Sequence, residues 1–106
     1  MFVVIFRAKA AKQDSQYSET VTQLRRLAFE QYGCIEFVAM NDGDDELTLS
    51  YWQDEQAIKR WKQDTSHLLA QKQGRNKWYL DYRVEVAHIT RSYQFTAADR
   101  PKWLTR

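Results

Sequence analysis

The residues of this chain that could take part in chemistry are concentrated in one stretch, from Leu47 to Val86. Three of the four tryptophans and one of the two histidines fall within it. Tryptophan offers a flat apolar face on which a ligand ring can stack, and histidine readily gains or loses a proton near neutral pH. Such crowding indicates the wall of a pocket for an aromatic ligand.

Each of these residues also has a purely structural interpretation. Trp61 follows Ala57 and Ile58 at helical spacing, as an ordinary core residue would. Trp52 stands at the end of a predicted strand, where packing against the core is an adequate explanation. His67 could lie on the surface or help to cap a helix. The pocket interpretation depends on the coincidence of these residues on one segment.

The hydrophobic pattern divides the chain into strands and helices. Strands are predicted where β-branched and aromatic residues alternate, and helices where apolar residues recur every three or four positions. The predicted strands are Phe2–Ala8, Cys34–Met40, Leu47–Trp52 and Tyr82–Tyr93. The predicted helices run from Asp14 or Ser15 to Gly33, from Asp54 to a break near Asp64–Ser66, and from His67 to Leu80. The order β-α-β-β-α-β is that of the ferredoxin-like α+β fold, an antiparallel sheet with helices on one face.

The second face of the predicted sheet is not cleanly polar. The residues expected on it are Val3, Ile5, Met40 and Ile89, beside Arg7, Thr48, Arg83 and Glu85. An antiparallel sheet that faces water is normally polar on that side, and a half-apolar surface marks a contact site. Because two-fold dimers are the commonest oligomers, we expect a homodimer packed through this sheet face.

Length and composition indicate one ordinary globular domain. The 106 residues are 43% hydrophobic and 28% charged, which argues against a disordered chain. The net charge of +2 is spread over scattered basic residues, so neither nucleic acid nor a membrane surface is an expected partner.

Cys34 is interpreted as a small buried hydrophobe, and no cluster of Cys and His residues predicts a metal. Without a signal-like or membrane-spanning run, a cytoplasmic location is expected.

Residues in the aromatic stretch resemble a known family. The pattern consists of Tyr51-Trp52, Asp54-Glu55 with Ala57 and Trp61, His67, Gly74-Arg75, and Trp78-Tyr79 with Asp81, Tyr82 and Val84. It is similar to the antibiotic biosynthesis monooxygenase family, which implies a dimeric α/β barrel. The resemblance covers about residues 2–93. We therefore expect a domain of residues 1–95 and a C-terminal tail of residues 96–106.

One branch of this family degrades haem, and its characteristic residues are only partly matched. Its members carry an asparagine in the first strand, a tryptophan on the helix after the third strand, and a haem-ligating histidine further along that helix. Trp61 matches the tryptophan, but Phe6-Arg7 stands where the asparagine is expected. Gln71 occupies the place of the histidine, and His67 lies one turn earlier. Haem binding or haem degradation is therefore an alternative, and no cofactor is the expectation.

Another branch uses no cofactor, and the resemblance implies roles for residues of this chain. A phenol or hydroquinone supplies electrons to dioxygen once it is deprotonated, inside a dry cavity shaped for the ring. The implied catalytic residues are His67, as the base, and Trp61. The implied substrate-binding residues are Trp52, Tyr51, Arg75 and Tyr79.

Two other classes of function share this fold. A non-catalytic homodimer could use the same cavity for a small ligand, since a fold does not determine a function. RNA-binding domains share the β-α-β-β-α-β order, but the third strand here, Glu46–Trp52, lacks their basic-glycine-aromatic run. We therefore expect a cofactor-independent monooxygenase acting on a small aromatic or quinol-like substrate, with the ligand-binding homodimer as the alternative.

Overall fold

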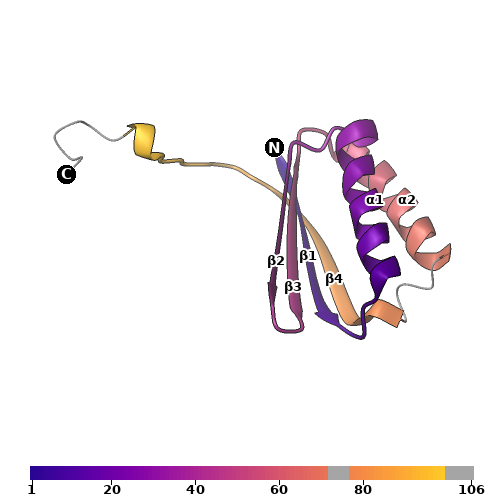
Figure 1. The fold of residues 1–106 in the computed structure, drawn as a ribbon. Coiled ribbons are helices and arrows are strands. Elements are labelled where there is room, and N and C mark those ends of the chain that lie inside the picture. The colour runs from indigo at the N-terminus through magenta and orange to yellow at the C-terminus, as the bar shows by residue number, and fades with distance from the viewer. Residues whose placement is uncertain (72–76, 100–106) are drawn as a thin grey trace.

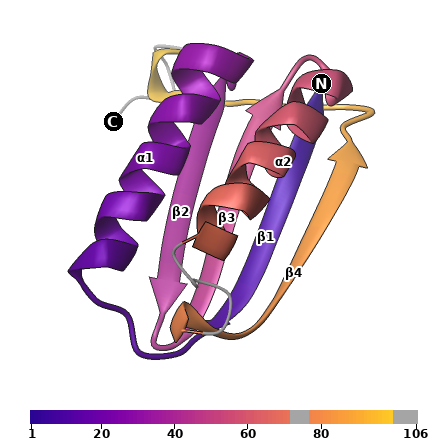
Figure 2. The same ribbon diagram turned by 90° about the vertical axis from the view of Figure 1, so that its right-hand side faces the viewer.

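The computed structural model describes residues 1–71 and 77–99 as a four-stranded antiparallel sheet with two helices on one face (Figure 1). The elements are β1 (Phe2–Ala10), α1 (Ser15–Tyr32), β2 (Glu36–Asp42), β3 (Asp45–Trp52), α2 (Glu55–Gln71), β4 (Tyr79–His88) and a short 3₁₀ helix, η1 (Ala97–Asp99). The strand order is β2-β3-β1-β4, and Figure 2 shows both helices lying over the sheet, roughly along the strands. The predicted ferredoxin-like architecture is confirmed.

Both ends of α1 are fixed by residues that the sequence identifies. The Asp14 Oδ1 atom accepts the backbone N–H of Tyr17 at 3.0 Å, which satisfies one of the donors left open in the first helical turn. At the other end Gly33 has a φ of 76°, in the left-handed region that glycine adopts without strain. These caps set the residues at which α1 begins and ends.

The hairpin between β2 and β3 is tighter than the sequence predicts. Asn41 and Asp42, assigned to a loop, pair with Glu46 and Asp45 of the neighbouring strand. The turn is made by two residues, and Gly43 at its first position has a φ of 60°. As a result β3 begins at Asp45, and Glu46 lies within the sheet.

α2 is one continuous helix, and the predicted break near Asp64–Ser66 is wrong. The Thr65 hydroxyl donates to the carbonyl of Trp61, one turn earlier, at 2.8 Å. The side chain is thereby satisfied within the helix instead of competing with it. Asp54 caps the start as predicted, because its Oδ1 accepts the N–H of Gln56 at 2.8 Å.

The last strand begins and ends earlier than predicted. β4 starts at Tyr79, inside the stretch assigned to a helix, and ends at His88 instead of Tyr93. Tyr79 pairs with Ala10 across a register shift that follows Lys9. Gly74 and Arg75, which belong to the resemblance described above, lie outside the described residues.

The side chains that face the helices follow from the register of β1 with its two neighbours. Phe2, Val4 and Phe6 lie opposite Trp52, Ser50 and Thr48 of β3, and opposite His88, Val86 and Val84 of β4. The prediction that Thr48 lies on the face turned away from the helices is wrong, because alternation along β3 places it on the same side as Ser50. Two clusters of buried residues form the core on this side. One contains Trp52, Ile58, Ala28 and Cys34, and the other contains Ala8, Leu69, Trp78 and Tyr79. The buried position predicted for Cys34 is confirmed.

The opposite face of the sheet is covered by neither α1 nor α2 (Figures 1 and 2). The register places on it the apolar residues Val3, Ile5, Val38, Met40, Leu47, Leu49 and Tyr51, together with Arg7, Arg83 and Glu85. We call this surface the open face. The half-apolar character predicted for it is confirmed.

Beyond β4 the chain leaves the sheet on the side of the open face (Figures 1 and 2). The Tyr93 side chain in this extended segment is 87% exposed. The division into residues 1–95 and a tail of residues 96–106 stays a prediction, and Pro101 and Trp103 of that tail lie outside the described residues. Among the helices that the structure describes, none has the length and apolar character needed to cross a membrane.

Candidate functional site

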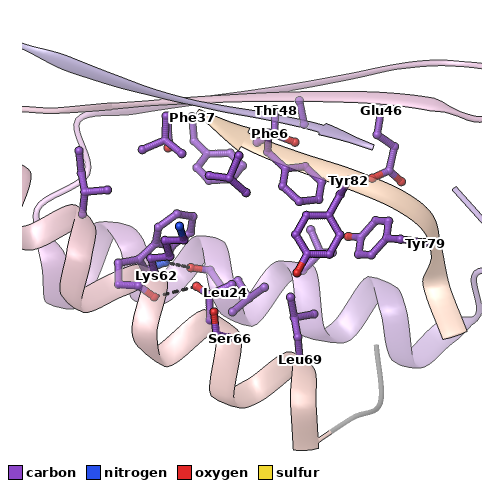
Figure 3. A pocket seen from close by; sticks show the side chains of 18 of the residues that line it. Phe6, Leu24, Phe37, Glu46, Thr48, Lys62, Ser66, Leu69, Tyr79 and Tyr82 are labelled. Carbon is purple, nitrogen blue, oxygen red and sulfur yellow. Dashed lines mark hydrogen bonds between the residues drawn. The ribbon is translucent and has the colours of Figure 1, made fainter. Parts of the chain in front are cut away.

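A cavity lies between the inner face of the sheet and the two helices (Figure 3). Its volume is about 180 Å³, and an engineered apolar cavity of about 150 Å³ is known to bind benzene. A single substituted ring therefore fits. The walls are mainly apolar and aromatic, and they include Phe6, Leu24, Phe37, Trp61, Leu69 and Tyr82.

Trp61 forms the aromatic wall at one end of the cavity. Its indole Nε1–H donates to the backbone carbonyl of Leu24 at 3.1 Å. The ring centre lies 5.2 Å from that of Trp52 and 6.5 Å from that of Phe37. Because its single donor is used within the protein, Trp61 can contact a ligand through the face or edge of its ring but cannot donate a hydrogen bond to it.

Trp52 stands behind this wall and is fully buried. Its Nε1–H donates to the Ser50 hydroxyl at 2.9 Å, so its one polar atom is also satisfied. Ser50 lines the cavity, whereas Trp52 does not. Trp52 therefore positions Trp61 through ring packing instead of contacting a ligand itself.

The other end of the cavity is polar and is built around Glu46. This residue is 8% exposed, and it is the only carboxylate among the described residues that line the cavity. The Tyr17 hydroxyl donates to Glu46 Oε1 at 2.7 Å, and the Gln13 Nε2 donates to the same oxygen at 2.8 Å. Figure 3 shows the Glu46 side chain beside Tyr79 and Tyr82.

The phenols around Glu46 are held in their neutral form. Burial raises the pKa of Tyr17, and the hydrogen bond to Glu46 raises it further. Burial also raises the pKa of Tyr79 to about 12, although the hydrogen bond with Tyr17 acts in the opposite direction. Both phenols therefore remain protonated far above neutral pH, and Tyr17 uses its proton in the hydrogen bond to Glu46.

The sequence profile of the antibiotic biosynthesis monooxygenase family matches residues 1–73. These residues run from β1 through α2 and supply most of the cavity wall. The chain belongs to the antibiotic biosynthesis monooxygenase family.

Two relatives match nearly all of this chain but differ in how much of their own length is matched. YqjZ of Bacillus subtilis is 34% identical over 95 residues, which cover 89% of this chain and 83% of that protein. The jasmonate monooxygenase of Pyricularia oryzae is 29% identical over 106 residues, which cover 94% of this chain but 48% of that protein. This chain therefore spans about half the length of the jasmonate monooxygenase.

Solved structures extend the similarity to the fold. A variant of SnoaB, a cofactor-independent oxygenase from Streptomyces nogalater, superposes with a TM-score of 0.68 and covers 86% of this chain and 94% of its own. The two sequences are 10% identical, so this likeness concerns the fold alone.

The structure brings together only some of the residues that the family resemblance implies. Trp61 and Tyr79 line the cavity, and Trp52 supports it from behind. Tyr51 lies on the open face, opposite Val3, and does not reach the cavity. The catalytic and binding roles assigned from the sequence stay predictions for these residues.

His67 does not line the described cavity. The His67 side chain is exposed on α2 and does not line the cavity, whereas its neighbour Ser66 does. One residue corresponds to about 100° around a helix, and this rotation is enough to turn His67 away from the sheet. Arg75 lies outside the described residues. As a result the structure offers no geometric support for His67 as the base.

Sequence reasoning missed the polar end of the cavity, Glu46 with Tyr17 and Gln13. The sequence did contain one signal for Glu46. It lies two residues before Thr48, and alternation along a strand puts it on the same inner face of β3 as Thr48, Ser50 and Trp52. Tyr17 likewise begins the apolar stripe of α1 that continues through Val21 and Leu24 to the cavity. A buried carboxylate at an inward strand position is uncommon enough to mark a site on its own.

Proposed function

We propose that this family member is a cofactor-independent monooxygenase that oxidises a small phenol or hydroquinone with dioxygen. The observation that supports the proposal is a single-ring cavity, apolar along its walls and carboxylate-bearing at one end, in a chain of this family. Apolar walls exclude water from a reactive intermediate, and one polar end orients the ring. The names of one relative, a jasmonate monooxygenase, and of one structural neighbour, a cofactor-independent oxygenase, support an oxygenase in general, and neither names a phenol or hydroquinone as substrate.

The reaction balances without a further redox partner. In the simplest case a phenol and dioxygen give a para-quinone and water. The phenolic O–H bond and the para C–H bond break, one oxygen atom becomes the new carbonyl, and the other leaves as water with the two hydrogens. The ring supplies all the electrons that dioxygen accepts. The protein therefore has to bind and orient the ring, exclude water and manage one proton.

Residues of the cavity are suited to these tasks. Trp61, Phe37 and Phe6 come from three different elements and offer ring faces or edges to a bound ring. Glu46 supplies an acceptor at the polar end, with its geometry fixed by Tyr17 and Gln13. Dioxygen is small and apolar, so it can share the apolar part of the cavity with the ring.

The described residues do not fit haem. Gln71 stands in the place of the haem-ligating histidine, and the nearest histidine, His67 one turn earlier, is exposed and does not line the cavity. A cavity of about 180 Å³ accommodates one ring and not a porphyrin, which contains four pyrrole rings. The proposal therefore includes no cofactor.

We also propose that two copies associate through the open face. Seven apolar side chains lie on it, and a contiguous patch of this kind is a contact surface. The segment after β4, with its exposed Tyr93, extends on the same side and would meet a second copy placed there (Figure 1). A two-fold pair also leaves both cavities on the outer, helical sides.

Oxygen uptake tests the proposed reaction. The protein is incubated with a panel of single-ring phenols and hydroquinones, and oxygen consumption is compared with quinone formation by absorbance. We expect uptake that depends on the protein and stops in a Trp61→Ala variant, while Glu30→Gln, an exposed position on α1, behaves as wild type. His67→Ala in the same assay tests the assignment of the base made from the sequence. Ligand binding without any uptake would contradict an oxygenase and favour the non-catalytic binding function.

A further inference from the structure

The Glu46 carboxylate uses only one of its oxygens within the described protein. Tyr17 and Gln13 both donate to Oε1, and no described donor reaches Oε2. None of the ion pairs in the described part of the chain includes Glu46. Among the described residues, the one fully buried side-chain polar atom without a partner is Trp78 Nε1, so Glu46 Oε2 is still accessible. Oε2 is therefore an acceptor that a hydroxyl group in the cavity can use.

We propose that Glu46 Oε2 is the recognition site for a neutral hydroxyl group carried by a single ring. This inference rests on the proposed function and deepens it, because it names the class of ligand that the cavity selects. The position of Glu46 supports it, because Figure 3 shows Glu46 and Phe37 towards opposite ends of the cavity. The Trp61 ring centre lies 6.5 Å from that of Phe37, so the aromatic wall belongs to the end away from Glu46. A ring that stacks near Trp61 can therefore direct a substituent towards Glu46.

Tyr17 is an example, within the protein itself, of a phenol held by this carboxylate. Its hydroxyl donates to Glu46 at 2.7 Å, and this bond contributes to the raised pKa of Tyr17 because a phenolate would face the carboxylate charge. The same electrostatics apply to a ligand at Oε2. A neutral hydroxyl is accepted there, whereas a phenolate or a carboxylate is repelled.

Lys62 is the other charged residue among the described lining, and it acts in a different environment. It lies on α2 on the opposite side of the cavity from Glu46, and its side chain is exposed to solvent (Figure 3). Water screens an exposed ammonium group, so its attraction for an anion is weak compared with that of a buried charge. We therefore place the selection at Glu46.

The size of the cavity restricts the ligand further. A volume of about 180 Å³ matches one ring with small substituents. The inferred ligand is thus a neutral, hydroxyl-bearing, single-ring compound.

Three probes with the same ring test this selection. They are 4-methoxyphenol, which has a hydroxyl donor, 1,4-dimethoxybenzene, which has none, and 4-methoxybenzoate, which is an anion. Binding is measured by equilibrium dialysis under nitrogen, so that no turnover occurs. We expect 4-methoxyphenol to bind roughly 10- to 100-fold more tightly than the other two, the usual range for a hydrogen bond to a charged group.

The variant Glu46→Gln keeps the shape of the side chain but replaces the Oε2 acceptor with an amide donor. We expect it to lose the preference for 4-methoxyphenol, whereas Glu30→Gln keeps it. Equal binding of the three probes by wild type, or an unchanged preference in E46Q, would overturn the proposal. Tighter binding of 4-methoxybenzoate would also overturn it, and loss of that binding in Lys62→Gln would assign the selection to Lys62.

The dialysis separates this inference from the proposed reaction. Selective anaerobic binding of 4-methoxyphenol supports hydroxyl recognition even when no oxygen is consumed in the uptake assay, which would refute the oxygenase. Unselective binding combined with oxygen uptake refutes hydroxyl recognition and leaves the oxygenase in place.

Discussion

The indole N–H of Trp61 donates to the backbone carbonyl of Leu24 at 3.1 Å and joins α2 to α1 above the cavity. A second link between the two helices runs from the Tyr32 hydroxyl to the Asp64 carboxylate. Together these bonds hold the helices at the separation that the cavity requires. Trp61 is therefore both a wall of the site and part of the structure that keeps the site open.

Substitutions of Trp61 should separate these two contributions. Trp61→Phe keeps an aromatic ring and removes the hydrogen bond to Leu24, so we expect a loss of about 1 kcal/mol in the free energy of unfolding. Trp61→Ala also removes the ring, and we expect a loss of roughly 3 kcal/mol and no measurable binding of a ring ligand. Urea unfolding and equilibrium dialysis measure the two effects. Equal stability of the two variants would show that the ring makes no packing contribution.

The stability of the protein should fall in alkali because of Tyr79. Its pKa is about 12 in the folded protein, against an ordinary value near 10, so the folded state holds the proton more strongly than the unfolded chain. This contribution is fully present below pH 10 and disappears as the pH rises towards 12, with a size of roughly 3 kcal/mol. Tyr17, whose pKa is also raised, acts in the same direction.

Urea unfolding across this pH range tests the effect of Tyr79. Wild type should lose stability steeply between pH 10 and 12, whereas Tyr79→Phe, which has no proton to lose, should show a shallower decrease. Tyr93→Phe is a suitable control, since Tyr93 is almost fully exposed. Identical slopes in wild type and Tyr79→Phe would contradict the raised pKa.

The architecture could be predicted from the sequence because strong local signals agree with one another. Asp14 and Gly33 delimit α1, and alternation identifies β1 and β3. Helical spacing also placed Trp61 on the inner side of α2, where the structure finds it. These signals depend on the local chain and do not require knowledge of distant contacts.

The details that could not be predicted depend on distant partners or on single hydrogen bonds. Asp64–Ser66 has the composition of a turn, but the Thr65 hydroxyl bonds to the Trp61 carbonyl and the helix continues. Glu46 lies within β3 because the hairpin closes at Gly43 and Asp44 and the strand begins two residues before the start predicted for it, and composition alone does not determine that closure. His67 does not line the cavity, whereas Ser66, one residue earlier on α2, does.

Asp14 should influence both the start of α1 and the position of Tyr17. Its Oδ1 caps the helix, and its Oδ2 lies 2.9 Å from the Lys77 Nζ. The Lys77 ammonium is the main reason that the pKa of Asp14 is lowered, so this contribution is present near neutral pH and is lost as the pH falls through the folded pKa. Asp14→Asn retains a capping side chain and loses the charge, whereas Asp14→Ala loses both.

Thermal unfolding of these two variants distinguishes the cap from the ion pair. We expect Asp14→Ala to lower the Tm by a few degrees and Asp14→Asn to lower it less, because an exposed ion pair contributes little. The difference between wild type and Asp14→Asn should vanish in acid. A larger decrease in Asp14→Asn than in Asp14→Ala would show that the ion pair, and not the cap, holds this end of α1.

A charge placed in the centre of the open face should separate the proposed dimer. Leu49 lies between Ile5 and Val38 on this face, so Leu49→Glu would bury a carboxylate without a partner if two copies pack there. We expect sedimentation at micromolar concentration to show a dimer for wild type and a monomer for Leu49→Glu. Gln23→Glu adds the same charge at an exposed position on α1 and should remain a dimer. A monomer for wild type, or a dimer for Leu49→Glu, would exclude the open face as the contact.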